Sequence, residues 1–94
     1  MELGKTINLE RRLLVKTKRG EITDLKISIL NVCENIDLLA FFAEIEFTGH
    51  VNMNIKIYGV DELDALKNSI NYIDTQLSHI CEDATLLWDD KSEY

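Results

Sequence analysis

The side chains best able to do chemistry in this sequence are two histidines and two cysteines, His50, His79, Cys33 and Cys81. Histidine is the commonest general base, but neither histidine lies in a local pattern with a nucleophile and an orienting carboxylate. We therefore expect His50 to be an exposed turn residue. We expect His79 to interact with the negative end of a helix. The pattern predicts no catalytic residue.

The same four residues predict neither a metal site nor a reactive thiol. A structural zinc site needs four ligands, usually as spaced pairs, and His79 with Cys81 is the only close pair. Cys33 has no cationic neighbour in the sequence that would favour its thiolate. We expect Cys81 to be buried on a helix. We expect no disulfide, because small secreted scaffolds normally carry several.

The common enzyme motifs are also absent from the sequence. It contains no glycine-rich phosphate loop, no Gly-x-Ser-x-Gly elbow and no His-Glu-x-x-His helix. We therefore expect a non-catalytic protein without a cofactor. The alternative is an enzyme acting on a small metabolite, and a pocket that joined either histidine to carboxylates would favour it.

Charge is abundant and unevenly distributed. The 94 residues carry a formal net charge of −7, with seven basic and four acidic residues in 1–30 against three basic and thirteen acidic in 31–94. Such a chain is a poor general binder of nucleic acid, because that affinity comes from neutralising phosphates with Lys and Arg. An acidic surface instead suits a basic protein partner, or solubility alone.

The basic side chains cluster around the first predicted hairpin. They could form a nucleic-acid patch, but pairing across the sheet with Glu44 and Glu46 is the preferred interpretation. The basic residues concerned are Arg11, Arg12, Lys16, Lys18, Arg19 and Lys26.

Carboxylates and aromatic rings of the C-terminal half are the predicted partner-binding residues. The carboxylates would steer a basic toxin domain onto the protein, and aromatic anchors would supply most of the binding energy. The alternative is a solvated helix face and tail, with the first three carboxylates capping the helix rather than binding calcium. The predicted set is Asp61, Glu62, Asp64, Asp74, Tyr72, Trp88, Asp89 and Asp90, with Phe42 and Tyr58 as further exposed aromatics.

Apolar residues at every second position predict four strands. Arg11 interrupts the first strand, which suggests a bulge or twist there. Residues 31–39 mix polar and aliphatic side chains and are expected to form a loop. In the third strand Phe41 is expected to face the core and Phe42 to face outward. The predicted strands are residues 6–18, 24–29, 39–47 and 51–58.

After Gly59 the apolar period changes to 3.6 residues, which predicts a long helix with Asp61 as its N-cap. A helix of about 20 residues, about 30 Å long, can cover one face of a four-stranded sheet. The predicted fold is therefore α+β, an antiparallel ββββα meander. The expected core-facing stripe of the helix is Leu63, Leu66, Ile70, Ile73, Leu77 and Ile80.

The end of the chain is ambiguous. Residues 84–88 either add a short edge strand or fix the helix end through Trp88, and residues 89–94 are expected to be a flexible acidic tail. No linker, repeat or low-complexity segment divides residues 1–94, so one domain is expected. The sequence lacks an apolar run of about 20 residues and a signal-like start, which favours a cytoplasmic protein without a membrane partner.

Three segments carry a resemblance to a protein family: Arg11–Val15, Tyr58–Asp61 at the step into the helix, and Leu86–Asp90. Together they resemble a family of small, uncharacterised bacterial α+β proteins, and the resemblance spans most of the chain. Small acidic proteins of this kind include immunity proteins, which neutralise the toxins of competing bacteria. The resemblance implies a bacterial protein of immunity or antitoxin type.

The leading hypothesis is thus stoichiometric, non-catalytic binding of a basic toxin or enzyme. The second hypothesis is a self-associating module that forms a homodimer through an exposed strand edge or aromatic residues.

Overall fold

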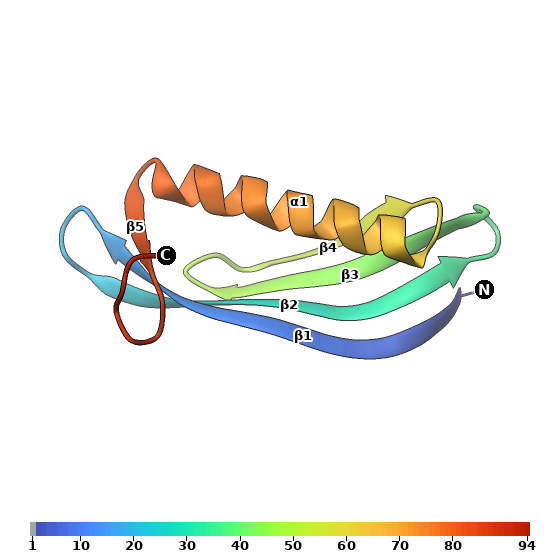
Figure 1. The fold of residues 1–94 in the computed structure, drawn as a ribbon, viewed down its shortest axis with the longest axis horizontal. Coiled ribbons are helices and arrows are strands. Elements are labelled where there is room, and N and C mark those ends of the chain that lie inside the picture. Colours follow the sequence, from blue (N-terminus) through green and yellow to red (C-terminus); the bar gives the residue numbers. More distant parts are fainter. Residues whose placement is uncertain (1) are drawn as a thin grey trace.

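The computed structural model describes the backbone of residues 2–94 and the side chains of residues 7–94. One antiparallel sheet carries a single long helix on one face, and a short fifth strand follows the helix (Figure 1). The strand order β4-β3-β2-β1-β5 confirms the predicted α+β meander and decides for an added edge strand. The elements are β1 (Glu2–Thr17), β2 (Ile22–Asn35), β3 (Ala40–Gly49), β4 (Met53–Gly59), α1 (Glu62–Cys81) and β5 (Ala84–Leu87).

The prediction of a loop over residues 31–39 was wrong. β2 continues to Asn35, and only residues 36–39 form the turn. The register with β3 shifts between Ile29 and Asn31, so that Val32 faces the core opposite Ala43. A bulge inserts one residue and changes which positions face inward. The period-two pattern therefore breaks there although the strand does not.

The interruption at Arg11 is not a bulge. Arg11 stays in register opposite Ile27, and the irregularity in β1 lies between Thr6 and Leu9. An arginine occupies a core-facing position here because the sheet is uncovered beside it.

α1 packs on the sheet through small residues at its beginning. Its buried line is Ala65, Ser69, Ile73 and Leu77, while the predicted stripe residues Leu63 and Ile70 are exposed. A Cβ on Gly59 would clash with the backbone of Ala65, so the helix meets β4 at van der Waals distance. The close approach turns the small side chains inward, which displaces the larger ones to the flank of the helix.

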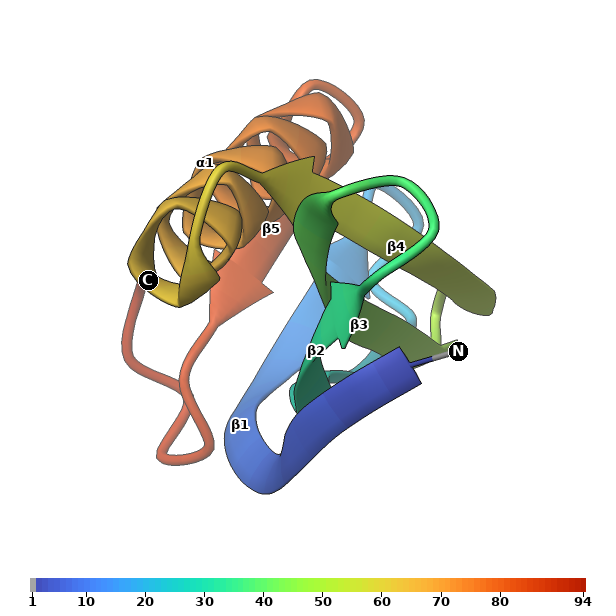
Figure 2. The same ribbon diagram turned by 90° about the vertical axis from the view of Figure 1, so that its right-hand side faces the viewer.

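α1 covers only part of the sheet. Its backbone lies close to β4, β3, β2 and β5 but, in the described part of the chain, not to β1, which reaches the common core through the side chains of Leu13 and Val15. Seen from the end, α1 lies beside β4 and away from the first half of β1 (Figure 2). β5 pairs only with the last residues of β1, Leu14–Thr17.

Phe42 is not an exposed aromatic as predicted. It does point to the face opposite α1, but its side chain is only 1% exposed. The Tyr58 ring lies 5.6 Å away, centroid to centroid, and the Lys56 Nζ lies 4.7 Å from the centroid of the Phe42 ring. Cross-strand neighbours can bury a residue without a second layer, which period-two reasoning does not anticipate.

The last six residues fold back instead of forming a loose tail. The Trp88 backbone N–H donates to the Ser92 carbonyl at 2.8 Å, and the Tyr94 N–H donates to the Leu86 carbonyl at 3.0 Å. Leu87 also forms an isolated antiparallel bridge with Glu93. Among the described residues, no helix is both long enough and apolar enough to cross a membrane.

Candidate functional site

The predicted acidic residues lie at separate places rather than on one surface. Asp61, Glu62 and Asp64 lie at the N-terminal end of α1, whereas Asp89 and Asp90 follow β5, near the other end of the helix (Figure 1). A 20-residue helix is about 30 Å long, so one small contact cannot use both groups.

Two residues of the N-terminal acidic group bond to the protein's own backbone. The Asp64 N–H donates to Asp61 Oδ1 at 2.7 Å, and the Val60 N–H donates to Asp64 Oδ2 at 2.9 Å. These are the bonds of a helix N-cap, as the capping interpretation predicted.

Tyr72 and Asp74 lie on different sides of α1. Tyr72 is half-buried against the core, and its hydroxyl lies 3.4 Å from the Met53 sulfur. Asp74 is exposed and faces β1 across a groove. Of these two predicted residues, only Asp74 presents its functional group to solvent.

The remaining predicted residues belong to a site that we call the C-terminal aromatic cluster, formed by Arg11, Trp88 and Tyr94. The two rings lie 4.9 Å apart between centroids, and the Arg11 Cζ lies 5.6 Å from the Trp88 centroid and 5.5 Å from the Tyr94 centroid. Arg11 Nη1 also donates to the Tyr94 hydroxyl at 2.6 Å. Both rings stay accessible, with 40% of Trp88 and 43% of Tyr94 exposed.

Exposed carboxylates of Asp89, Asp90 and Glu93 belong to the same turn. The turn fixes Asp90, because its Oδ1 accepts from the Ser92 N–H at 2.9 Å and from the Ser92 hydroxyl at 2.5 Å. The hydroxyl hydrogen bond, and then the backbone one, hold the pKa of Asp90 below its usual value of 3.8. Asp89 borders a depression that is also lined by Arg12, Asp24 and Lys26, so the three carboxylates of the turn do not all belong to one surface with the rings.

This arrangement can bind a cationic side chain. Aromatic faces attract guanidinium and ammonium groups, as they already do with Arg11, and carboxylates pair with the same groups. The sequence prediction includes Trp88, Asp89 and Asp90 among the partner-binding residues but not Arg11 or Tyr94. The signal for Arg11 was its unexplained place among apolar residues of a strand. Tyr94 gave no signal except that it is aromatic.

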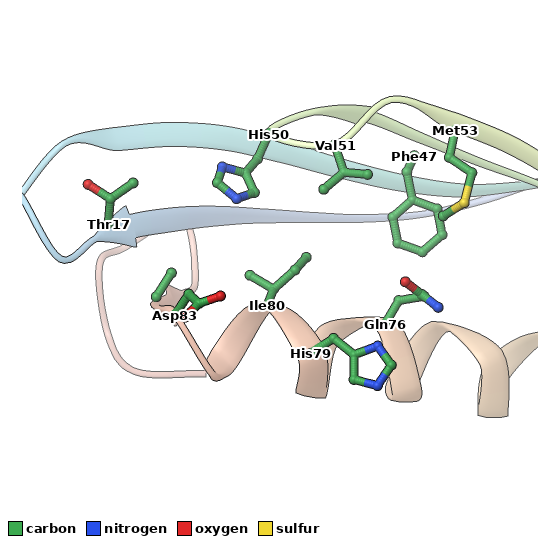
Figure 3. A pocket seen from close by; sticks show the side chains of 10 residues that line it. Thr17, Phe47, His50, Val51, Met53, Gln76, His79, Ile80 and Asp83 are labelled. Atoms are coloured by element: carbon green, nitrogen blue, oxygen red, sulfur yellow. The ribbon is translucent and has the colours of Figure 1, made fainter.

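A second candidate site is a pocket of about 340 Å³ that brings both histidines near one carboxylate, that of Asp83. His50 comes from the turn between β3 and β4 and His79 from the last turn of α1, with Ile80 between them (Figure 3). His50 Nδ1 lies 3.0 Å from the Thr23 hydroxyl oxygen. Within the described residues, no carboxylate hydrogen-bonds to either ring.

One prediction about the cysteines was wrong. Cys81 is exposed rather than buried. It follows Leu77 by four residues, but the helix ends there and the chain leaves for β5, so nothing covers it. Cys33 is half-buried on β2. In the described part of the chain, no group of three or more His, Cys, Asp or Glu side chains is placed to hold a metal ion.

The basic residues do not all lie on one face of the sheet. Arg11 faces the helix side of the sheet, whereas Arg12 and Lys26 lie opposite each other on adjacent strands. Arg12 pairs with Glu10 of its own strand, its Nη2 lying 2.9 Å from Oε1.

The predicted cross-strand partners were wrong. The register places Glu44 opposite Asn31 and Glu46 opposite Ser28, so neither lies opposite Lys26 of β2, and the cation opposite Glu44 is Lys56 of β4.

Comparisons with models of protein families, with curated proteins and with solved structures found no match to this chain. The geometry of the described residues therefore carries the functional argument.

Proposed function

We propose that this chain is a non-catalytic, cytoplasmic protein-binding domain of the bacterial immunity or antitoxin type. It would neutralise a basic toxin or enzyme by stoichiometric binding. The observation that supports this most directly is the C-terminal aromatic cluster, in which Trp88 and Tyr94 remain accessible at the two ends of a turn that also carries exposed acidic residues.

The cluster has the composition of a binding hot spot. Trp and Tyr are enriched among the residues that contribute most of the binding energy at interfaces. Their side chains have few rotatable bonds, so they lose little conformational entropy on binding. The rings are held before binding by Arg11 and by backbone hydrogen bonds of the folded-back tail. A partner's arginine or lysine would stack on them and meet the carboxylates of Asp90 and Glu93, while Asp89 would contribute at longer range.

The net charge contributes at long range. A protein of charge −7 attracts a basic partner before contact, which raises the association rate at low salt. The acidic group at the start of α1 would contribute to this field rather than to the contact itself. The same net charge opposes general binding of nucleic acid.

Affinity capture with matched variants tests the proposal. The tagged protein, Trp88→Ala and Tyr58→Ala are each incubated with lysate of the native host, washed at low and high salt, and analysed by mass spectrometry. Tyr58 is the control, because it is a similarly exposed aromatic on β4 outside the cluster. We expect the unaltered protein and the control to retain one basic protein stoichiometrically, and salt to release it.

The affinity for that protein is then measured with purified components. Loss of a hot-spot ring costs about 2 kcal/mol or more, so Trp88→Ala should weaken binding by about 30-fold or more. Capture of no basic partner, or equal binding by Trp88→Ala and the control, would contradict the proposal.

Self-association is a second candidate function, and a specific feature favours it. The helix side of β1 is left open along its first half, beside the exposed side chains of Leu9 and Ile70. Light scattering on the purified protein separates the two candidates, since a homodimer forms without any partner.

A further inference from the structure

The sheet is wider than the helix that covers it. Along the first half of β1, where β5 is absent, four strands spaced about 4.8 Å apart span about 14 Å, whereas a helix with its side chains is about 10 Å across. α1 lies over β4, β3 and β2, and the helix side of β1 is left open along its first half. Figure 2 shows this separation between α1 and β1.

The open region is a groove of about 210 Å³, which we call the α1–β1 groove. Its floor is the buried pair Ile27 and Ile29 of β2 together with Ile73 of α1. One wall comes from β1 and the other from the flank of α1. The wall residues are Leu9, Glu10 and Arg11 on β1, and Ile70 and Asp74 on α1.

Two large aliphatic side chains on the walls of the groove are exposed to solvent next to its buried floor. Leu9 is 52% exposed and Ile70 is 48% exposed, although both lie at the edge of the core. Asp74 also borders a second depression, which extends toward Leu86 and Tyr94. The groove and this second depression therefore adjoin each other at Asp74 on the flank of the helix.

Each wall of the groove carries an aliphatic side chain and then a charged one, and the distance between the two is similar on both walls. β1 and α1 run in the same direction along the molecule (Figure 1). Leu9 and Arg11 are two residues apart on a strand, about 6.6 Å, and Ile70 and Asp74 are four residues apart on a helix, about 6 Å. Each wall thus presents an aliphatic side chain followed by a charge, and the two charges have opposite sign.

We propose that the α1–β1 groove is the interface of a two-fold homodimer. A two-fold axis parallel to the groove places the helix wall of each copy against the strand wall of the other. Ile70 then meets Leu9 of the second copy, and Asp74 meets Arg11 of the second copy. Each contact occurs twice, as an isologous interface requires. An axis across the groove would instead oppose aliphatic and charged groups.

Both charged groups can accept the new contact. Within the described residues, the Asp74 carboxylate has no hydrogen-bond or ion-pair partner, although it faces an arginine-bearing wall. Arg11 uses one N–H for the Tyr94 hydroxyl, and a guanidinium has five. The interface does not depend on the proposed function, because it involves no other protein.

The test exchanges the charges at positions 74 and 11 in separate variants. The molecular mass of each protein in solution is measured by sedimentation equilibrium over a wide concentration range. In a dimer of Asp74→Arg, the new arginine of each copy would face Arg11 of the other copy. In a dimer of Arg11→Asp, the new aspartate of each copy would face Asp74 of the other copy. We expect the unaltered protein to dimerise and each variant to dimerise at least about tenfold more weakly. A mixture of the two variants restores both opposite-charge pairs, so it should form a heterodimer about as tightly as the unaltered protein.

Two further variants keep the result interpretable. Asp83→Arg makes the same charge change outside the groove, beside His79, and should leave the dimer unchanged. Ile70→Glu alters only an exposed side chain and should weaken the dimer without affecting the fold, as judged by circular dichroism. The proposal is overturned if the unaltered protein is a monomer at every concentration. It is also overturned if the mixed variants do not associate, or if Asp74→Arg and Asp83→Arg dimerise equally.

Discussion

At the scale of single residues, the hydroxyl of Ser92 controls the ionisation of Asp90. The carboxylate accepts two hydrogen bonds from Ser92, and these favour its charged form. Because the pKa of Asp90 is lowered in the folded state, the group contributes stability above the usual value of 3.8. That contribution is lost as the pH falls through the lowered pKa.

We predict that Ser92→Ala raises the pKa of Asp90 toward 3.8, since it removes the hydrogen bond that lowers the pKa most. The measurement is an NMR titration of the Asp90 side-chain carboxyl carbon. Ser78→Ala is the matched control, because that serine donates to the Asp74 carbonyl on α1, away from Asp90. An Asp90 titration identical in both variants would mean that the turn does not hold the carboxylate as described.

At the scale of elements, the junction between β4 and α1 determines where the helix lies. Gly59 does not have a positive φ, so its role is space rather than backbone conformation. Any side chain there would meet the backbone of Ala65. That contact brings Ala65 and Ser69 onto the sheet and leaves Ile70 at the flank, which creates one wall of the α1–β1 groove.

We predict that Gly59→Ala destabilises the protein by about 1–3 kcal/mol, the usual cost of overpacking. At a glycine without a steric constraint and without a positive φ, the same change would stabilise by about 0.4–1 kcal/mol. The sign of the change in the free energy of unfolding, measured by urea denaturation, therefore tests the contact.

Gly20→Ala serves as the comparison for this experiment. Gly20 has open space around it and a φ of 84°, so only backbone strain of about 1–2 kcal/mol is expected there. A stabilised Gly59→Ala protein would show that the helix is not held against β4.

At the scale of the whole molecule, the chain is elongated. Its Cα radius of gyration is 14.8 Å and its extents are 47 × 21 × 19 Å, whereas a compact domain of this length has a radius of gyration of about 12 Å. The length follows from the long strands β1 and β2, of 16 and 14 residues. The groove runs along this length, so dimerisation would thicken the molecule without lengthening it.

Small-angle X-ray scattering distinguishes this geometry from other assemblies. For the Asp74→Arg variant we predict a radius of gyration near the single-copy value of 14.8 Å. For the unaltered protein at high concentration we predict twice the mass with a maximum dimension still close to 47 Å. An end-to-end dimer, with a maximum dimension near twice that of one copy, would contradict the side-by-side arrangement.

Much of the architecture follows from local sequence patterns. Alternating side chains predicted the strands, the change of period after Gly59 predicted α1, and Asp61 was correctly expected to cap it. These features depend on backbone geometry and on neighbours within a few residues, which a sequence displays directly. The fold class follows because an amphipathic helix and a one-sided apolar sheet must cover each other.

Only the tertiary structure decided which residues form the sites. Arg11 and Tyr94 are 83 positions apart in the chain and meet because β5 pairs with β1 and the tail folds back. The acidic residues that the sequence predicts as one binding surface form two separate groups, because they lie near opposite ends of a helix about 30 Å long. Phe42 is buried by neighbouring strands. Such contacts depend on strand order, bulges and the position of the helix, and local periodicity carries no information about any of them.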